Sequence, residues 1–528
     1  MEKVGGIHVI DYAIIIASFV ISIVVGLRFA KGQKDTGNYF KSSGTIPSWA
    51  IGMSILATLI SSVTFLAYPG EGYSSNWILL VQGLMVPLVL VFIVGVIVPL
   101  FRKVIRLSAY EYFEKRFGYY ARLYTSLGFV LNHFTKMGTV FYLISLAVSG
   151  MIGINIVYVI LVIAVVVILV TLIGGIEAVI WLDVIQGFML IVGGILSLLI
   201  IMFSVEGGPS AIWTVAMENG RIGFGPFDLE FVNLTFIVMA LNGIFYAIQK
   251  YGTDQTIVQR YLTAKTDKEA VKASLIGVLL SVPVWALFMF IGTALFSYYQ
   301  ITGAALPADI KPDAVFPFFI MTKLPVGVVG LIISALIAAA FSSLDSDLNC
   351  LSAICLEDYY LRWRPFTSEK DKMKKSKLFV ILAGIGAVAI AMFYVWAGGE
   401  GVLGIVFTLY AIFSGGIAGM FLLGIFSTRT NKKGMYLGII ASIIFTFYAI
   451  LSSTPLDLNG KEYLLMDLGQ LNFSQHKYMI GVYSHVVLMI VAYGSSFIFR
   501  EKPVDESLTY YGWLSLKRDN RLKSKLDT

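Results

Sequence analysis

The chain has 528 residues, of which 58% are hydrophobic and only 13% are charged, and its mean hydropathy is +0.83. A soluble protein of this length needs a charged surface, so the composition excludes a soluble globular protein and is typical of a polytopic membrane protein. The formal net charge of +7 does not indicate nucleic-acid binding, because the lysines and arginines lie almost entirely in short loops between apolar segments.

Apolar segments long enough to cross about 30 Å of hydrocarbon predict an all-α protein with about thirteen transmembrane helices. They fall at residues 8–28, 47–69, 77–100, 123–149, 154–174, 181–204, 231–250, 272–298, 315–352, 377–397, 402–427, 435–453 and 478–499. No cleavage pattern of small residues follows the first segment, so it is expected to be a retained span. We expect a single integral membrane transport domain over residues 1–500 and a cytoplasmic tail over residues 501–528.

The loops between these segments alternate in charge. Basic clusters follow the first, third, seventh, ninth and eleventh segments, and the cluster after the seventh comprises Arg260, Lys265, Lys268 and Lys272. Positive charge is enriched in cytoplasmic loops. Thirteen crossings then place the N-terminus outside and the C-terminus, with its basic stretch at residues 517–525, in the cytoplasm. The protein is therefore expected in the cell (inner) membrane, surrounded by the lipid bilayer.

Two apolar segments are weakened by polar residues. Thr58, Ser61, Ser62 and Thr64 interrupt the second segment, and hydroxyl side chains compete with a helix for backbone hydrogen bonds. A corresponding weak point at residues 249–255 ends the seventh segment. Unwound backbone at membrane depth is tolerated where it lines a cavity, so paired breaks in two halves of a chain indicate the binding site of a transporter. The two repeats are expected at about residues 47–204 and 231–427.

Asp183 begins an apolar stretch that continues to about Met202. A charge at that depth costs at least about 2.5 kcal/mol and is rarely retained without a role. A second polar cluster, at residues 342–347, interrupts the ninth segment. Two such interruptions suggest a cation site inside a membrane protein.

The cluster in the ninth segment has the spacing of a helix stripe. Ala339, Ser342, Ser343 and Ser346 fall on one face, and hydroxyls with an exposed backbone carbonyl suit a hard cation such as Na⁺. Asp345 projects about 60° off that stripe. Close packing of helices is the alternative explanation for the serines. The aspartates among them favour a cation site, because packing does not need charge.

Several motifs in the chain resemble the sodium/solute symporter family, which includes transporters of sialic acid and of galactose. The similar segments run in order between about residues 8 and 435, and the motifs that carry the resemblance lie at residues 49–58, 108–117, 174–186, 255–260 and 342–349. The resemblance implies the LeuT-type fold, in which two inverted repeats of five helices contain broken helices.

The resemblance also implies two sodium sites. The main site would use the backbone of Ala57, Ile60 and Ala339 and the hydroxyls of Ser342 and Ser343. A second site, as in the sialic acid transporters, would use Asp183, Ser342, Asp345 and Ser346. The chain departs from the family at Asp345, where a hydroxyl is usual. This change would tighten or rearrange the second site, or would let a proton replace the ion.

The implied solute pocket draws on Leu59, Ser61 and Thr64 of the broken segment, on Gln82 and on Lys136. Leu59 stands where the family has a threonine. Lys136 matches an arginine that receives the solute carboxylate in sialic acid transporters. It lies too deep to reach the membrane surface, so it needs a partner.

Two partners for Lys136 stay open, a solute carboxylate or an internal ion pair with Asp183 or Asp345. His133, one turn earlier, is interpreted as an interior histidine rather than a metal ligand. A tyrosine that closes the cytoplasmic side of the solute in sugar transporters is replaced here by Lys250.

We therefore predict a Na⁺-coupled secondary active symporter that imports a small organic solute, first a sugar acid such as sialic acid or another carboxylate. A neutral sugar or polyol is the alternative, and it is favoured if Lys136 is internally paired. An ion channel or a membrane enzyme is disfavoured, because no continuous polar lining, Walker loop, nucleophile elbow or zinc motif is present. The expected partners are Na⁺, the solute and lipid, without nucleic acid, and a monomer is expected.

Overall fold

The computed structural model describes residues 7–29, 35–42, 44–396, 415–458, 461–499, 501 and 505–515. These residues are mostly helical. Among them, seven helices are long and apolar enough to cross a membrane, or up to nine if each bent pair of helices is one span. The expected basic stretch at residues 517–525 lies outside the described residues.

The helices of the first half are α1 (Val9–Phe29), α2 (Thr36–Lys41), α3 (Ser48–Leu59), α4 (Ser62–Ser74), α5 (Leu80–Val104), α6 (Glu111–Phe117), α7 (Tyr119–Ile152), α8 (Ile156–Phe203), α9 (Gly208–Glu218), α10 (Phe236–Gly252) and α11 (Gln255–Leu262). Those of the second half are α12 (Asp267–Thr302), α13 (Pro312–Lys323), α14 (Val328–Ile354), α15 (Leu361–Trp363), α16 (Glu369–Trp396), α18 (Ile417–Phe426), α19 (Lys432–Ser453) and α20 (Lys477–Ser495). A π-helical turn at Cys355–Tyr360 joins α14 to α15, and short 3₁₀ turns lie at Gly469–Leu471 and Glu506–Leu508. Strands β1 (Pro455–Leu458) and β2 (Lys461–Leu464) form an antiparallel hairpin in which Pro455 pairs with Leu464.

Most predicted segments correspond to helices, with one clear error. The ninth segment, 315–352, was expected to be one overlong helix, but it contains most of α13 and most of α14. Pro325 favours extended backbone at Leu324, which has φ −83° and ψ 148°, and Gly327 follows at φ 88°. The fifth and sixth segments join as α8, which is kinked at Gly175. Much of the eleventh segment, 402–427, falls on residues 397–414, outside the described residues.

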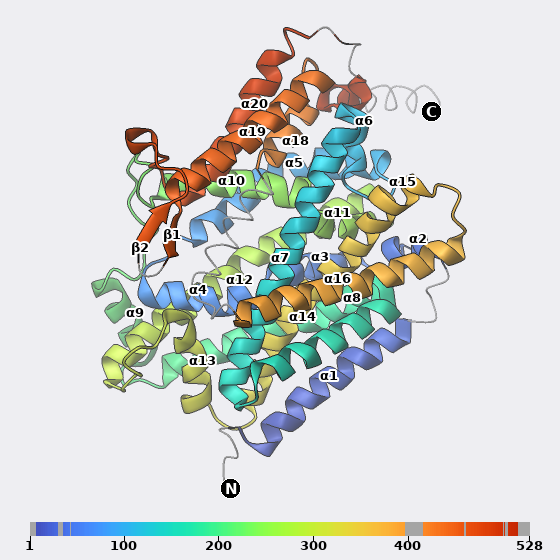
Figure 1. The fold of residues 1–528 in the computed structure, drawn as a ribbon. Helices are drawn as coiled ribbons and strands as arrows, with labels where there is room; N and C mark the ends of the chain where they lie inside the picture. Colours follow the sequence, from blue (N-terminus) through green and yellow to red (C-terminus); the bar gives the residue numbers. More distant parts are fainter. Residues whose placement is uncertain are drawn as a thin grey trace, which may run out of the picture.

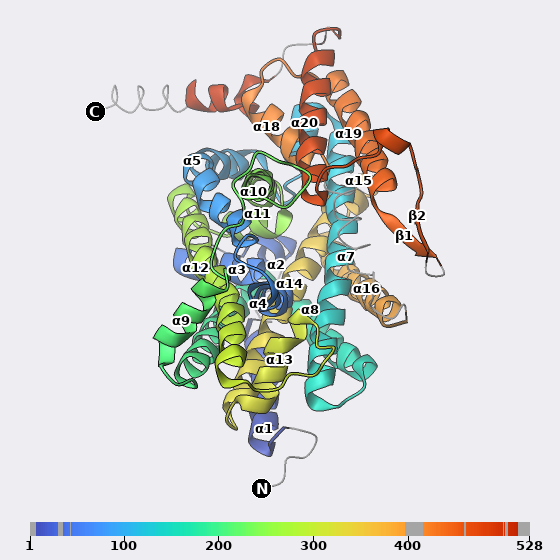
Figure 2. The same cartoon turned by 90° about the vertical axis from the view of Figure 1, so that its left-hand side faces the viewer.

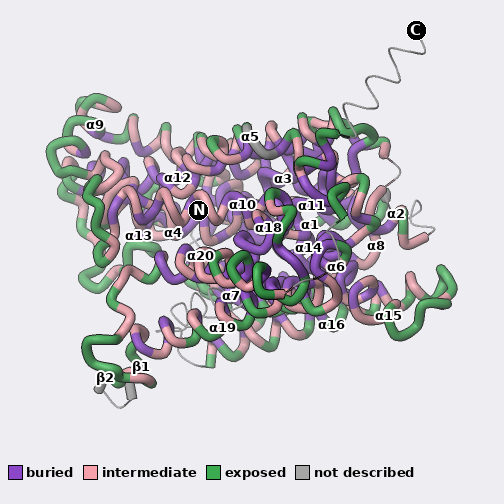
Figure 3. The backbone as a smooth tube through the Cα atoms, turned by 90° about the horizontal axis from the view of Figure 1, so that it is seen from above, coloured by how far each residue is buried: buried purple, intermediate pink, exposed green. Residues whose placement is uncertain are grey.

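The helices form a bundle in which α1, α8 and α16 run side by side (Figure 1). The pair α19 and α20 packs together at the end opposite α1 (Figure 2). Buried backbone concentrates around α11 and α14, whereas exposed backbone lies at the rim (Figure 3). Large apolar side chains such as Val162, Leu199 and Ile444 are exposed there. An apolar rim around a polar centre is the arrangement expected of a protein surrounded by lipid.

Two helix breaks lie close to the buried centre. Between α3 and α4, which are bent by 59°, Ile60 and Ser61 are extended, and the Ser61 side chain caps α4 by accepting from the Val63 N–H. Between α10 and α11, the Asp254 side chain caps α11 in the same way by accepting from the Thr256 N–H. These caps satisfy backbone donors that a broken helix would otherwise leave unpaired.

The broken helix packs very closely on α12. A Cβ atom added at Gly292 would overlap the carbonyl oxygen of Pro69, and one added at Gly72 would overlap that of Met289. Small residues in membrane helices allow this approach of backbone to backbone. The position of α4 is therefore fixed by glycine contacts with α12.

Candidate sodium and solute sites

The break between α3 and α4 meets α14 at the predicted main sodium site. The Ser342 hydroxyl lies 3.0 Å from the carbonyl oxygen of Ala57 on α3 and 3.1 Å from that of Ala339 on its own helix, so it can donate to either one. Ala57, Ile60, Ala339 and Ser342 line one narrow space between the helices. The structure thus brings together four of the five predicted residues.

Ser343, the fifth residue, follows Ser342 on α14. Its hydroxyl is buried and has no hydrogen-bond partner among the described residues. An unsatisfied buried polar group costs about 1–3 kcal/mol. Carbonyl groups freed by a helix break coordinate Na⁺ in transporters, and a neighbouring unpaired hydroxyl adds an oxygen ligand of the same kind. The donor set therefore suits Na⁺.

Asp183 of α8 forms a fully buried ion pair with Arg260 of α11, with 2.8 Å between carboxylate oxygen and guanidinium nitrogen. Ser54 of α3 donates to the same carboxylate oxygen and accepts from Arg260 Nε at 2.7 Å. The other oxygen of Asp183 has no hydrogen-bond partner among the described residues. Arg260 was interpreted from the sequence as part of a basic cytoplasmic loop, and this was wrong because Asp183 provides a buried counter-ion.

Arg260 also connects Asp183 to the predicted residues on α14. Its guanidinium donates to the Ser346 hydroxyl, which in turn lies 3.3 Å from Asp345 Oδ1 and donates to the Ser342 carbonyl. All four residues of the predicted second sodium site therefore lie in one network. Two buried carboxylates face one guanidinium, so the network carries a formal surplus of one negative charge if both are ionised. This surplus is what a bound cation would neutralise.

Lys136 of α7 pairs with Asp347 of α14, and its Nζ lies 3.1 Å from both carboxylate oxygens. The internal pair expected with Asp183 or Asp345 was therefore wrong in its partner. Asp345 and Asp347 are two residues apart, so they point about 200° apart around the helix. Asp345 lies on the side of α11, and Asp347 lies on the side of α7.

The other predicted solute residues form no hydrogen bond or ion pair with Lys136 among the described residues. Leu59 and Thr64 are buried, whereas Ser61 and Gln82 are partly exposed. Their role in binding a solute stays a prediction.

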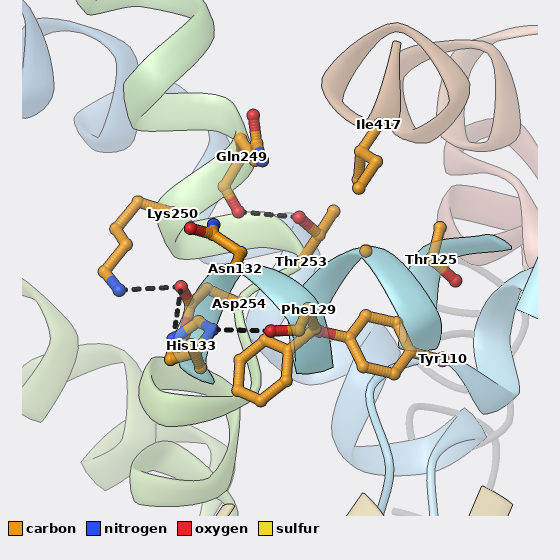
Figure 4. Close-up of a pocket in the computed structure, with 11 residues that line it drawn as sticks. Tyr110, Thr125, Phe129, Asn132, His133, Gln249, Lys250, Thr253, Asp254 and Ile417 are labelled. Carbon is orange, nitrogen blue, oxygen red and sulfur yellow. Dashed lines mark hydrogen bonds and ion pairs between the residues drawn. The ribbon is translucent and has the colours of Figure 1, made fainter. Parts of the chain in front are cut away.

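A chain of charged side chains continues from Lys136, and sequence reasoning missed most of it. His133 Nε2 lies 3.6 Å from Asp347. It also lies 3.7 Å from Asp254, and Lys250 Nζ lies 2.6 Å from Asp254 (Figure 4). The spacing of Lys250 and Asp254, at i and i+4, is a signal that could have indicated their pairing. The chain connects the break between α10 and α11 to α14.

Broken helices that meet a carbonyl-rich and hydroxyl-rich site at the centre of a bundle define a cation-coupled membrane transporter. The model of the sodium:solute symporter family matches residues 39–442. The chain therefore belongs to the sodium:solute symporter family.

Relatives and solved structures agree with this assignment. The sodium/sialic acid symporter of Proteus mirabilis is 35% identical over 85% of this chain and 94% of its own length. That of Aliivibrio fischeri is 33% identical over 85% of this chain and 89% of its own length. The substrate-bound, outward-open structure of a Na⁺-coupled sialic acid symporter superposes with a TM-score of 0.84, at 32% identity, over 94% of this chain and 99% of that one.

These comparisons confirm several predictions made from the motifs. The protein is an all-α, multi-pass membrane protein of the symporter fold, it is a transporter rather than an enzyme, and Na⁺ is its coupling ion. A nucleobase-cation-symport-1 transporter with a TM-score of 0.51 and 13% identity shares the fold alone.

Proposed function

We propose that the protein imports a sugar acid, sialic acid or a closely similar carboxylated sugar, together with Na⁺. The two curated relatives described above are named as sodium/sialic acid symporters, which supports this solute class. Within the chain, the observation that carries the proposal is the placement of Lys136. It is a cation near the middle of α7, and 27% of its side chain is exposed.

Lys136 can hold a solute carboxylate without leaving Asp347. An ammonium group has three N–H donors, and the two oxygens of Asp347 accept from at most two of them. Asp347 is fully buried and balances the charge of the lysine, whereas part of the Lys136 side chain is exposed. A carboxylate on that side would form a charge-assisted hydrogen bond.

We further propose that Na⁺ binds where the α3–α4 break meets α14, through Ala57, Ile60, Ala339, Ser342 and Ser343. Binding there would order the break and so complete the solute pocket formed by Leu59, Ser61, Thr64, Gln82 and Lys136. A second Na⁺ would bind at Asp183, Ser342, Asp345 and Ser346. Each positive charge that moves inward gains about 2.3 kcal/mol per 100 mV of membrane potential.

A neutral sugar or polyol is the second candidate solute. The ion pair between Lys136 and Asp347 favours it, because an internally neutralised lysine has no need of an anionic ligand. The two candidates differ in the charge required of the solute, and this difference can be measured.

Thermal unfolding of the purified protein, with and without Na⁺, would separate these solutes. Sialic acid at about 100 times its Kd stabilises a protein by about 2.7 kcal/mol. We expect this shift only with Na⁺, and we expect the methyl ester, a neutral solute of nearly the same shape, to bind at least about tenfold more weakly. A Lys136→Gln/Asp347→Asn double variant, which leaves neither charge unpaired, should lose the preference for the acid.

Equal shifts with the acid, its ester and neutral sugars would instead establish the neutral-solute alternative. No Na⁺-dependent shift with any sugar acid would reject the proposed function.

We also propose that the protein is a monomer in the cell (inner) membrane, without a nucleic-acid partner, with its N-terminus outside and its C-terminus in the cytoplasm. The alternation of basic loops supports this orientation. The transport domain would cover residues 1–500, with repeats at about 47–204 and 231–427, and residues 501–528 would form the tail. Labelling of single introduced cysteines from one side of the membrane would test the orientation.

A further inference from the structure

A ring of hydrogen bonds joins the two predicted sodium sites, and two of its members, Ser54 and Arg260, belong to neither site. Ser54 of α3 is fully buried. Its hydroxyl accepts from Arg260 Nε at 2.7 Å and donates to the Asp183 carboxylate. This one hydroxyl therefore contacts both members of the buried ion pair.

The Arg260 guanidinium is held in one orientation by contacts on all three of its nitrogens. Nε donates to Ser54, and one terminal nitrogen donates to the Thr256 carbonyl oxygen at 2.7 Å. The other terminal nitrogen donates to Asp183 and to the Ser346 hydroxyl. Because a guanidinium is planar and rigid, these contacts fix Ser54 of α3 relative to Ser346 of α14.

The ring closes through the main sodium site. The Ser346 hydroxyl donates to the carbonyl oxygen of Ser342, and the Ser342 hydroxyl lies 3.0 Å from the carbonyl oxygen of Ala57. Ala57 follows Ser54 by three residues, so the two share one turn of α3. The ring therefore runs through α3, α11 and α14, and its members are Ser54, Arg260, Ser346, Ser342 and Ala57.

The shared helical turns connect the two sites physically. A ligand that fixes Ala57 also fixes Ser54 on the same turn of α3, and one that fixes Ser342 also fixes Ser346 of α14. Ser54 donates to one oxygen of Asp183, and the other oxygen has no hydrogen-bond partner among the described residues. Ordering one site thus removes conformational freedom from the other, so a second ligand loses less entropy when it binds.

We propose that Ser54 is a positioning residue that couples the two sodium sites, so that Na⁺ at one site strengthens the binding of Na⁺ at the other. Its hydroxyl holds α3, which carries Ala57, against Asp183 of α8 and Arg260 of α11. Without this hydroxyl the ring is open at α3, and the two sites are ordered more independently. This inference rests on the proposed function, because it requires the second Na⁺.

Binding of ²²Na⁺ to the purified protein, with choline replacing Na⁺ at constant ionic strength, would test this coupling. Coupling between two sites typically amounts to about 5–150-fold, so the unsubstituted protein should bind two ions with a Hill coefficient above about 1.3. Ser54→Ala leaves the ion pair and the predicted ligands in place. It should still bind two ions, but with a Hill coefficient of about 1 and a half-saturating Na⁺ concentration at least about twofold higher.

Thr58→Val is the matched control. Thr58 is buried on α3 one turn after Ser54, and its hydroxyl donates to the Ser54 carbonyl oxygen at 2.8 Å, outside the ring. Valine has nearly the same shape without the hydroxyl, so this variant should keep the Na⁺ binding curve of the unsubstituted protein. If Ser54→Ala does not fold, Ser54→Cys should show the same loss of cooperativity, because a thiol is similar in size but is a weak donor and acceptor.

The outcomes distinguish this inference from the proposed function. An unchanged binding curve in folded Ser54→Ala, or two ions bound without cooperativity by the unsubstituted protein, would overturn the inference and leave a two-ion symporter. Loss of cooperativity in Thr58→Val as well would reveal a general disturbance of α3 and would also reject the specific role of Ser54. If the unsubstituted protein binds a single Na⁺, the second sodium site of the proposed function itself fails.

Discussion

At the scale of single residues, two buried aspartates at the centre of the bundle pair with cations from distant parts of the chain. Asp183 pairs with Arg260, which is 77 residues away, and Asp347 pairs with Lys136, which is 211 residues away. Removing one partner of a buried ion pair typically lowers the stability by about 3–5 kcal/mol, because the remaining charge is left uncompensated. Substitutions that test these residues should therefore neutralise both members or leave the pair intact.

The unpaired hydroxyl of Ser343 gives a prediction for the main sodium site. Ser343→Ala removes a buried polar group without a partner, so the protein without Na⁺ should lose little stability. With Na⁺, the variant should show about tenfold weaker binding, which is about 1.4 kcal/mol less stabilisation at saturating ion. Thermal unfolding across a Na⁺ titration measures both quantities.

Ser334→Ala is the matched control, since Ser334 is another buried α14 serine whose hydroxyl is unpaired among the described residues. It should leave the Na⁺ titration unchanged. Identical Na⁺ titrations for Ser343→Ala and the unsubstituted protein would remove Ser343 from the site.

Residue identity and spacing predicted part of this centre. The helix stripe of Ala339, Ser342 and Ser343 could be predicted from the sequence, because it depends only on local spacing. The structure places Ser342 against Ala57. The ion pairs of Arg260 and Asp347 could not be predicted from the sequence. Their contacts depend on which helix faces join in the bundle, and charge alone made Arg260 look like a loop residue.

At the scale of elements, the two helix breaks are held by different means. The break between α10 and α11 is held by ionic contacts of Asp254, whereas α4 is held against α12 by glycine packing. Gly292 is the tightest point of that packing, because an added Cβ would meet backbone atoms of Pro69 that cannot rotate away. Overpacking of this kind costs typically about 1–3 kcal/mol.

Gly292→Ala should therefore lower the stability of the protein by about 1–3 kcal/mol and weaken Na⁺ binding, because α4 would be displaced from the break. The measurement is thermal unfolding of the purified protein with and without Na⁺. Gly150→Ala on α7 is the matched control, since nothing lies within 4 Å of its added Cβ. A variant at Gly292 as stable as the one at Gly150 would contradict the close packing of α4 on α12.

Hydropathy predicted the existence of most membrane helices but not all of their ends. A window of average hydropathy passes over Pro325 and Gly327, which separate α13 from α14, because the flanking residues are strongly apolar. The α3–α4 break was predicted correctly, since its hydroxyl residues lower the hydropathy locally. A helix end that is caused by backbone geometry alone changes the local hydropathy less, so it is harder to predict from composition.

At the scale of the whole molecule, we expect the charge moved per transport cycle to depend on whether a second Na⁺ binds in the network around Asp345. With a monoanionic solute, one Na⁺ makes transport electroneutral and two Na⁺ move one net positive charge. Ionised Asp345 would add one negative charge to the network, because the Asp183–Arg260 pair is neutral by itself.

Asp345→Asn should therefore reduce the charge moved per solute from one to zero in reconstituted vesicles, with the ion pair intact. Simultaneous recording of current and solute flux measures this ratio. Asp309→Asn, at an exposed loop position, is the control and should keep the original ratio. An unaltered ratio in Asp345→Asn would show that Asp345 does not bind the second ion.

The placement of α14 has a thermodynamic consequence. This helix carries the predicted sodium ligands Ala339, Ser342 and Ser343, and one turn after Ser343 it carries Asp347, the counter-ion of Lys136. A shift of α14 would change both proposed sites together, so Na⁺ and the solute would be linked through a shared conformational equilibrium. Linkage is reciprocal. If bound Na⁺ changes the affinity for the solute by a given factor, bound solute changes the affinity for Na⁺ by the same factor. The tightness of the coupling is then a property of how α14 packs, not of either binding site alone.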